Sequence, residues 1–449
     1  MRTLACLLVL SFAGPALSAT INAPSCALSD VSAAMGSAAD GDTIMIPGGT
    51  CTWNSTLTVS KGVSIVGAGS GTSGSDTQLV GGRFTITTPN GKSVRVSGVR
   101  LSGTSGFNVI GATKSFRIDH VYFFQPTGAT EDRVIWIECA ASDYCAGVID
   151  HNTFDQSKGS INIHIREQAG SGNNSWNRPL DLGGVDAIYI EDNTFTRPAN
   201  TYDIEGAAAT DCDGGGRMVF RHNTLRNAWF MMHDSIIVGT RGCRKWEVYD
   251  NSWVTTSSEL ATSGQFAQLE VRGGTGVVYN NSFATSSGAD IYYSNYRAGG
   301  QTSGTPWSQT CQNSGTSRAC LGSRTSSPTS CTSDANCGGA TGSCVKIDGP
   351  GGSGLPTNYP CRDQMGTGDG NPQTITPALF WNNHVGSTQV VLDAGEHNDR
   401  TYLVEGRDFC VGASKPSSCG GKSVTYTPYT YPHPLAVSGP RPKAPVIQQ

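Results

Sequence analysis

One pattern of apolar and polar residues recurs along the middle of the chain. RMVFRHNTL, KWEVYDNSW and TGVVYNNSF each show alternating apolar residues, a polar pair ending in Asn, then Thr or Ser, then a large apolar residue. Their asparagines, Asn223, Asn251 and Asn281, are 28 and 30 residues apart. A fixed period of this length is typical of repeat proteins, in which each unit buries its apolar face against its neighbours.

The same pattern extends upstream and downstream of these three repeats. AIYIEDNTF, GVIDHNTF and ALFWNNHV carry it at Asn193, Asn152 and Asn383, and SFRIDHVYF fits with Val121 in the Asn position. The period of two before each Asn indicates strands, and Gly, Asn, Ser and Asp between the apolar runs indicate turns. About thirty residues accommodate three short strands and three turns. We therefore predict an all-β parallel β-helix, in which the stacked Asn side chains form an internal hydrogen-bonded ladder.

The chain resembles the right-handed parallel β-helix superfamily of pectate lyases and their relatives over roughly residues 40–405. The resemblance rests on the stretch GDTIMIPGGTCTWNSTLTVSKGVSIVGAG and on the repeated DHNTF-like turns. It implies a right-handed solenoid, and the lyases of this superfamily hold Ca²⁺ between acidic side chains of adjacent coils. Here the segment Ile149–His151 lacks the spaced acidic ligands that follow in the family. Calcium is thus an open expectation, with Asp203 and Glu205, or Asp211 and Asp213, as oxygen ligands.

The first 19 residues have the features of a secretory signal, with Arg2, a short apolar core and small residues at a cleavage region. That core is too short to span a membrane, and no later stretch qualifies. We therefore expect a secreted protein, extracellular or periplasmic, whose residues 20–449 form one β-helix domain. Ser29 and Asp30 indicate a short N-terminal helix that covers the open end of the solenoid.

Cysteine usage agrees with export. The chain has 15 Cys, and loss of Cys6 with the signal leaves an even number, as expected for a disulfide-bonded protein. Sequence proximity suggests three pairs: Cys139 with Cys145, Cys212 with Cys243, and Cys410 with Cys419.

Two segments depart from the repeat. Residues 299–372 are rich in Cys, Gly and Ser, and we interpret them as a disulfide-stapled excursion from one coil. A structural zinc site is the alternative, but the segment contains no His and no C-x-x-C. The Pro-rich residues 431–449 are predicted to form an extended strap along the surface.

The charge balance restricts the possible partners. The formal net charge is −4, and loss of Arg2 makes the mature chain more acidic. Nucleic-acid binding needs a basic surface, so we expect no nucleic-acid partner. The expected partner is a polysaccharide substrate, bound by a monomer.

A second strand lies between successive Asn turns, and these strands should stack into another sheet. In order they are RVIWIE, SINIHIRE, TYDIEG, WFMMHDS, AQLEVRG and IYYSNYR. If the alternate apolar residues point inward, one outer face carries His164, Arg166, Asp203 or Glu205, His233, Glu270 and Arg272. A solvated sheet face is the ordinary explanation for any one of these residues, but the concentration favours a groove. Exposed Trp229 and Tyr292 would suit sugar stacking there.

Candidate catalytic residues follow from the chemistry of uronate β-elimination, which needs a base, positive charge at the carboxylate and an acid for the leaving oxygen. TRGCRKWEVYDN contains Arg241 and Arg244, and basic residues at a similar place in pectate lyases supply the proton-abstracting Arg. A turn flanking Cys243 is the alternative explanation for both.

Histidine is the more ordinary base, since imidazole titrates near neutral pH. His233 or His164 would fill that role, with Arg272 as a charge stabiliser. Tyr202 or Tyr292 could supply the acid. Arg362 could reach the substrate from the excursion, or pair with Asp363 to pin a loop.

The leading hypothesis is therefore a secreted polysaccharide lyase acting on an acidic glycan. A glycoside hydrolase on the same scaffold is the second, with Glu270 and either Asp234 or Glu205 as the two carboxyl groups. A non-catalytic carbohydrate-binding or surface-structural solenoid is the third, because fold alone does not decide function.

Overall fold

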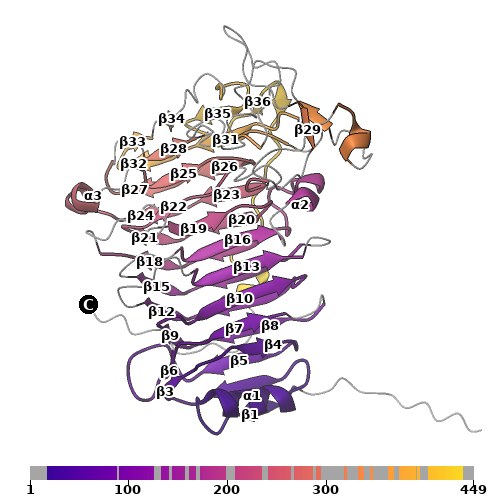
Figure 1. Ribbon diagram of the computed structural model, residues 1–449. Helices are drawn as coiled ribbons and strands as arrows, with labels where there is room; N and C mark the ends of the chain where they lie inside the picture. Colours follow the sequence, from indigo (N-terminus) through magenta and orange to yellow (C-terminus); the bar gives the residue numbers. More distant parts are fainter. Residues whose placement is uncertain are drawn as a thin grey trace, which may run out of the picture.

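The strands stack coil on coil into three long parallel sheets (Figure 1). The connections between parallel strands of one sheet are right-handed, and the fold is a right-handed parallel β-helix, as predicted. The computed structural model describes residues 18–87, 91–125, 133–140, 144–156, 161–167, 172–198, 208–234, 241–263, 267–286, 290–294, 318–320, 332–337, 344–346, 363–368, 374–390, 392–394 and 403–437.

Each of the three sheets takes about one strand from every coil. Sheet A contains β1 (Thr20–Asn22), β2 (Thr43–Ile46), β5 (Ser64–Gly67), β8 (Val94–Ser97), β11 (Phe116–Asp119), β14 (Gly147–Asp150), β17 (Ile188–Glu191), β20 (Arg217–Arg221), β23 (Lys245–Tyr249), β26 (Thr275–Tyr279), β31 (Ala378–Trp381) and β35 (Phe409–Gly412). Sheet B contains β3 (Gly49–Thr52), β6 (Thr77–Val80), β9 (Arg100–Ser102), β12 (Tyr122–Gln125), β15 (Thr153–Gln156), β18 (Thr194–Thr196), β21 (Thr224–Arg226), β24 (Ser252–Trp253), β27 (Ser282–Phe283), β32 (His384–Val385) and the antiparallel β33 (Thr388–Gln389). Sheet C contains β4 (Leu57–Val59), β7 (Arg83–Ile86), β10 (Gly106–Gly111), β13 (Ile135–Cys139), β16 (Ile163–Glu167), β19 (Ala208–Cys212), β22 (Trp229–Phe230), β25 (Leu269–Val271), β28 (Ile291–Tyr293) and β34 (Leu392–Ala394).

The remaining elements lie outside the three sheets. They are the helices α1 (Leu28–Ser37), α2 (Asn173–Asn177), α3 (Ser257–Ser263), η2 (Asp334–Cys337) and η3 (Pro434–Val437), and the hairpins β29 (Arg318–Cys320) with β30 (Cys344–Lys346) and β36 (Ser418–Cys419) with β37 (Lys422–Ser423). No helix in the described ranges is both long and apolar enough to cross a membrane.

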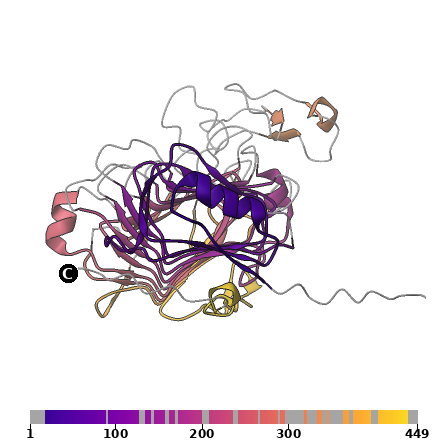
Figure 2. The same ribbon diagram turned by 90° about the horizontal axis from the view of Figure 1, so that it is seen from below.

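The N-terminal helix covers the open end of the solenoid, as predicted (Figure 2). Its residues Val31, Ala34 and Met35 are buried against the first coils. The helix starts slightly earlier than expected, with Ala27 rather than Ser29 at the N-cap. The Ser25 hydroxyl bonds instead to the backbone N–H of Ala27 and to the Asp30 carboxylate.

A continuous buried ladder of asparagines runs along the solenoid. The backbone N–H and the side-chain amide of Asn223 both donate to Oδ1 of Asn251, at 2.9 and 3.0 Å. The same double contact joins each of the other predicted ladder residues to the next, from Asn152 through Asn193, Asn223, Asn251 and Asn281 to Asn383. Val121, in the Asn position of the coil before, donates its backbone N–H to Asn152. The predicted internal ladder is confirmed.

The residue before each ladder position explains the polar pair in the repeat. His151, Asp192, His222 and Asp250 all have φ between 54° and 57°. Apart from glycine, Asn, Asp and His are the residues that enter this left-handed region most readily. The repeat therefore encodes a sharp bend followed at once by a buried amide.

Four disulfides lie in the described part of the chain. Cys139–Cys145, Cys212–Cys243 and Cys410–Cys419 form as predicted, and Cys26–Cys51 joins the helix region to the first coil. Such bonds persist in oxidising compartments. The predicted pairing of the excursion cysteines among themselves lies outside the described disulfides and stays a prediction.

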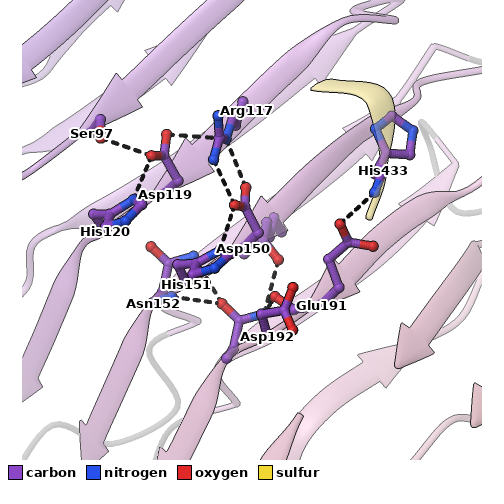
Figure 3. A network of polar contacts seen from close by, with 12 residues as sticks. Ser97, Arg117, Asp119, His120, Asp150, His151, Asn152, Glu191, Asp192 and His433 are labelled. Carbon is purple, nitrogen blue, oxygen red and sulfur yellow. Dashed lines mark hydrogen bonds and ion pairs between the residues drawn. The ribbon is translucent and has the colours of Figure 1, made fainter. Parts of the chain in front are cut away.

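Sheet A carries stacked charges on its outer side (Figure 3). Asp119, Asp150 and Glu191 are neighbours on β11, β14 and β17 and are inaccessible to solvent. Arg95 forks onto Asp119 at 2.6–2.7 Å, and Arg117 forks onto Asp150 at 2.7–2.9 Å. These paired charges neutralise one another, so the stack serves structure.

The end of the described chain runs back over sheet A as a strap, which we define as residues 424–437. Arg221 on β20 donates to the backbone carbonyls of Tyr429 and Thr430 at 2.8 and 2.9 Å. Further along, Glu191 accepts the His433 N–H at 2.7 Å (Figure 3). Of the segment 431–449 predicted as a strap, residues 431–437 are described.

Replacing a ladder asparagine should destabilise the fold. Asn251→Ala removes an oxygen that accepts two bonds from Asn223 and leaves both donors buried without it. We expect a loss of about 1–3 kcal/mol in the free energy of unfolding, measured by denaturant titration. The matched control is Asn54→Ala at an exposed position, which should be neutral. Equal midpoints for the two variants would contradict a stabilising ladder.

Candidate functional site

The second charged face of the solenoid is on sheet C. In β16 the buried core residues Ile163 and Ile165 alternate with His164 and Arg166. The next strand is β19, which sets Asp211 opposite His164.

This pairing corrects one prediction. The alternation in TYDIEG indicated that Thr201–Gly206 would supply the strand beside β16, but β19 begins at Ala208. The prediction was based on a short run of alternating apolar and polar residues. The strand that pairs with β16 is instead formed by the later segment, which begins at Ala208. Asp203 and Glu205 lie outside the described residues.

Five ionisable side chains contact one another in series and form what we call the His–Asp cluster: His233, Asp211, His164, Asp213 and Arg166. His233 Nδ1 lies 2.6 Å from Asp211 Oδ1. Asp211 Oδ2 lies 3.3 Å from His164 Nδ1. His164 Nε2 and Arg166 Nε each lie 3.4 Å from Asp213 Oδ1.

The two carboxylates of the cluster are ionised. Asp211 and Asp213 are each 3% exposed, and burial alone would raise the pKa of both. The neighbouring His233 and His164 outweigh burial and hold the pKa of Asp211 below its ordinary value. His164 and Arg166 lower the pKa of Asp213 in the same way.

The two histidines have different positions in the cluster. Arg133 Nε donates to His164 Nδ1 at 2.9 Å, and His164 Nε2 is the nitrogen nearer Asp213. His164 is 1% exposed and therefore an internal link. The His233 side chain is 14% exposed. Its Nδ1 bonds to Asp211, and within the described residues its Nε2 has no hydrogen-bond partner. His233 is thus held by Asp211 through one nitrogen, in a side chain that is partly accessible to solvent.

A disulfide fixes the carboxylates in place. Cys212, between Asp211 and Asp213 in sequence, bonds to Cys243. The backbone N–H of Gly214 donates to the Arg241 carbonyl at 2.8 Å, so the two segments also share main-chain contacts. The cluster is therefore positioned by a covalent cross-link as well as by sheet register.

The arginines beside Cys243 support the loops around the cluster. Arg241 makes a forked ion pair with Asp363, with contacts of 2.6–2.9 Å. The guanidinium carbons of Arg241 and Arg244 lie 4.3 and 4.8 Å from the ring centre of Trp176. Arg241 is 6% exposed and Arg244 1%. These contacts favour the structural alternative for both arginines, a turn that flanks Cys243. Asp363 pairs with Arg241, whereas Arg362 lies outside the described residues.

Arg272 is engaged in a similar way. Its Nε and Nη2 donate to Glu270 at 2.9 and 3.1 Å, and both residues are buried. Burial would lower the pKa of Arg272, but the negative charges of Glu270, Asp234 and Asp211 raise it. The neighbouring charge of Asp211 places this pair close to the His–Asp cluster, as a support.

The two aromatic candidates, Tyr292 and Trp229, differ in how far they are exposed to solvent. Tyr292 is opposite Glu270 in the register and is half-buried. Trp229 is inaccessible and packs against Ala208 and Met231. The expectation of an exposed Trp229 was wrong, because its strand is covered on the side away from the central core.

Two residues at the cluster were not among the sequence candidates. Trp136 on β13 is opposite His164, with its ring centre 4.8 Å from the imidazole. Arg133 precedes the same strand and contacts His164. The alternation in RVIWIE could have indicated Trp136, since it occupies the outward position of the neighbouring coil.

Asp203 and Glu205, two of the expected calcium ligands, lie outside the described residues, and within the described ranges no three His, Cys, Asp or Glu side chains are grouped to hold an ion. Asp211 and Asp213, offered as calcium ligands, contact imidazole and guanidinium groups instead. These residues therefore do not fit a calcium ion, and we derive no step through one.

Comparison with known proteins does not assign the chain to a family, so its class is defined by its fold and its candidate site. The chain matches no protein-family model, and a search of curated proteins finds no similar sequence. Its sheets and disulfides define a disulfide-bonded right-handed parallel β-helix protein with a charged cluster on sheet C.

A buried carboxyl beside the cluster gives stability a pH dependence. Glu167 ends β16 and is 3% exposed, and burial raises its pKa from 4.5 to about 7 although Ser175 N–H and Arg178 oppose the shift. The folded state therefore holds this proton more tightly than the unfolded chain. Its contribution is complete below pH 4.5 and is lost as the pH rises through about 7.

Glu167→Gln should remove that part of the pH dependence. Thermal melts between pH 4 and 8 should show a flatter profile and a variant that is more stable than the parent at pH 8, by at most about 3 kcal/mol. Glu405→Gln at an exposed position is the control. A parent-like slope in Glu167→Gln would show that another group carries the pH dependence.

Proposed function

We propose that this protein is a secreted polysaccharide lyase that cleaves an acidic, uronate-containing glycan by β-elimination at the His–Asp cluster. The observation that carries the proposal is the contact of His233 with Asp211 through Nδ1, which leaves Nε2 of this partly exposed side chain to act as a base. The signal-like N-terminus and the disulfides support secretion.

The cluster offers two of the groups that this reaction needs. His233 Nε2 would take the proton next to the uronate carboxyl group, and ionised Asp211 would stabilise the imidazolium that forms. Arg166 would neutralise the negative charge that develops at that carboxyl group. Arg166 is 23% exposed and contacts the cluster through Nε alone, so its terminal nitrogens are available to a ligand. Tyr292, half-buried beyond Glu270, is the described candidate for the acid.

The contacts of Glu270 disfavour the hydrolase alternative. A glycoside hydrolase needs one carboxyl group that stays protonated until it gives its proton to the leaving oxygen. Glu270, one of the carboxyl groups of that alternative, instead accepts hydrogen bonds from Arg272 at 2.9 and 3.1 Å. The binding solenoid remains the competing proposal, and only activity distinguishes it from a lyase.

Turnover would be tested by following ultraviolet absorbance, which unsaturated uronide products acquire, across a panel of uronate polymers. On a cleaved polymer, His233→Ala should lower kcat by about 10²–10³-fold, since it removes the base. The matched control is His151→Ala, because His151 is bonded to Asp150 at 2.8 Å in a similar pair on sheet A.

Unchanged kcat in His233→Ala would place the base elsewhere. New reducing ends without ultraviolet absorbance would indicate a hydrolase, and no product from any acidic glycan would leave the binding solenoid.

A further inference from the structure

Two arginines and a tryptophan meet in the two coils before the cluster carboxylates. The guanidinium carbon of Arg133 lies 4.5 Å from the ring centre of Trp136, and that of Arg166 lies 5.5 Å from it. Both cations thus pack against one indole on the outer side of sheet C. Trp136 Nε1 donates to Glu138 at 3.3 Å, which fixes the plane of the ring.

These arginines lack the partners that other arginines of the chain have. Arg95, Arg117 and Arg241 each fork onto a buried carboxylate. Within the described residues, Arg133 forms no ion pair, and Arg166 reaches Asp213 through Nε alone. Their terminal nitrogens therefore remain without a carboxylate partner.

The same two arginines are accessible to solvent. Arg133 and Trp136 are half-buried, and Arg166 is 23% exposed, whereas Arg241 is 6% exposed. A cationic site that is accessible and only partly paired within the described residues, in a chain with a net charge of −4, points to an anionic ligand.

We propose that Arg133 and Trp136 form a subsite for the oxyanion of a second acidic sugar, next to the sugar whose carboxyl group Arg166 would neutralise. The guanidinium fork matches a carboxylate or a sulfate ester, and contact with the indole limits the freedom of both arginines before the ligand arrives. The subsite rests on the proposed function in that it binds the same glycan. It adds that the substrate must be acidic at two neighbouring sugars.

The test is calorimetric titration of the full chain carrying His233→Ala, so that no ligand is cleaved, with an oligouronate, its carboxyl-reduced counterpart and a sulfated neutral oligosaccharide. Arg133→Gln should weaken oligouronate binding by about 10–100-fold, the effect of losing charge-assisted hydrogen bonds. Arg133→Lys keeps the positive charge but loses the forked guanidinium, so its affinity for the oligouronate should lie between those of the parent and Arg133→Gln. Binding of the carboxyl-reduced ligand should not change.

The matched control is Arg100→Gln on sheet B, where Arg100 lies 4.5 Å from the ring centre of Tyr122. It should leave all three affinities unchanged, and thermal melts would confirm that each variant folds.

Weaker binding of the sulfated ligand alone would assign a sulfate to the subsite. Parent-like oligouronate and sulfate binding in Arg133→Gln would overturn the subsite while leaving the lyase proposal intact. Weakened binding without any turnover by the parent would support the subsite and remove the lyase.

Discussion

The hydrogen bonds between stacked asparagine amides inside the solenoid determine which side chains lie next to one another on its outer faces. Each ladder asparagine from Asn193 to Asn281 accepts two bonds from the previous coil and donates to the next, in positions that are 1% exposed. A buried amide without these partners would cost about 1–3 kcal/mol. A slip of one residue between coils would break both bonds of a rung and turn every core side chain outward. The ladder therefore fixes the register of neighbouring coils.

That fixed register creates the candidate site. His164 and Asp211 are far apart in sequence and become opposite residues because β16 and β19 are in register. Arg133 reaches His164 from the preceding coil in the same way, across 31 residues. The Cys212–Cys243 disulfide then holds the segment that carries both aspartates. The His–Asp cluster is thus a product of stacking, with no motif that is continuous in the chain.

The two charged faces of the solenoid differ in how completely their charges are paired. On sheet A each carboxylate of the stack has a forked arginine or, at Glu191, both Arg221 and a strap N–H. On sheet C the Nε2 of His233 and the terminal nitrogens of Arg133 and Arg166 have no such partners in the described residues. Complete pairing stabilises a fold, whereas incomplete pairing at an accessible place leaves interactions for a ligand. The argument for function on sheet C depends on this contrast.

The sequence by itself determined the fold, the ladder and three disulfides, because each depends on a repeat or a spacing that local chemistry imposes. A left-handed bend before a buried Asn can be recognised in DHNTF or EDNTF without knowledge of any neighbour. The sequence also gathered His164, Arg166 and His233 on one face, since alternation decides which side chains point outward. Only the tertiary structure decided their partners. Which strand follows β16, which arginine pairs with Asp363, and whether Trp229 is covered depend on loops of unequal length, and nothing local in the sequence encodes how those loops close.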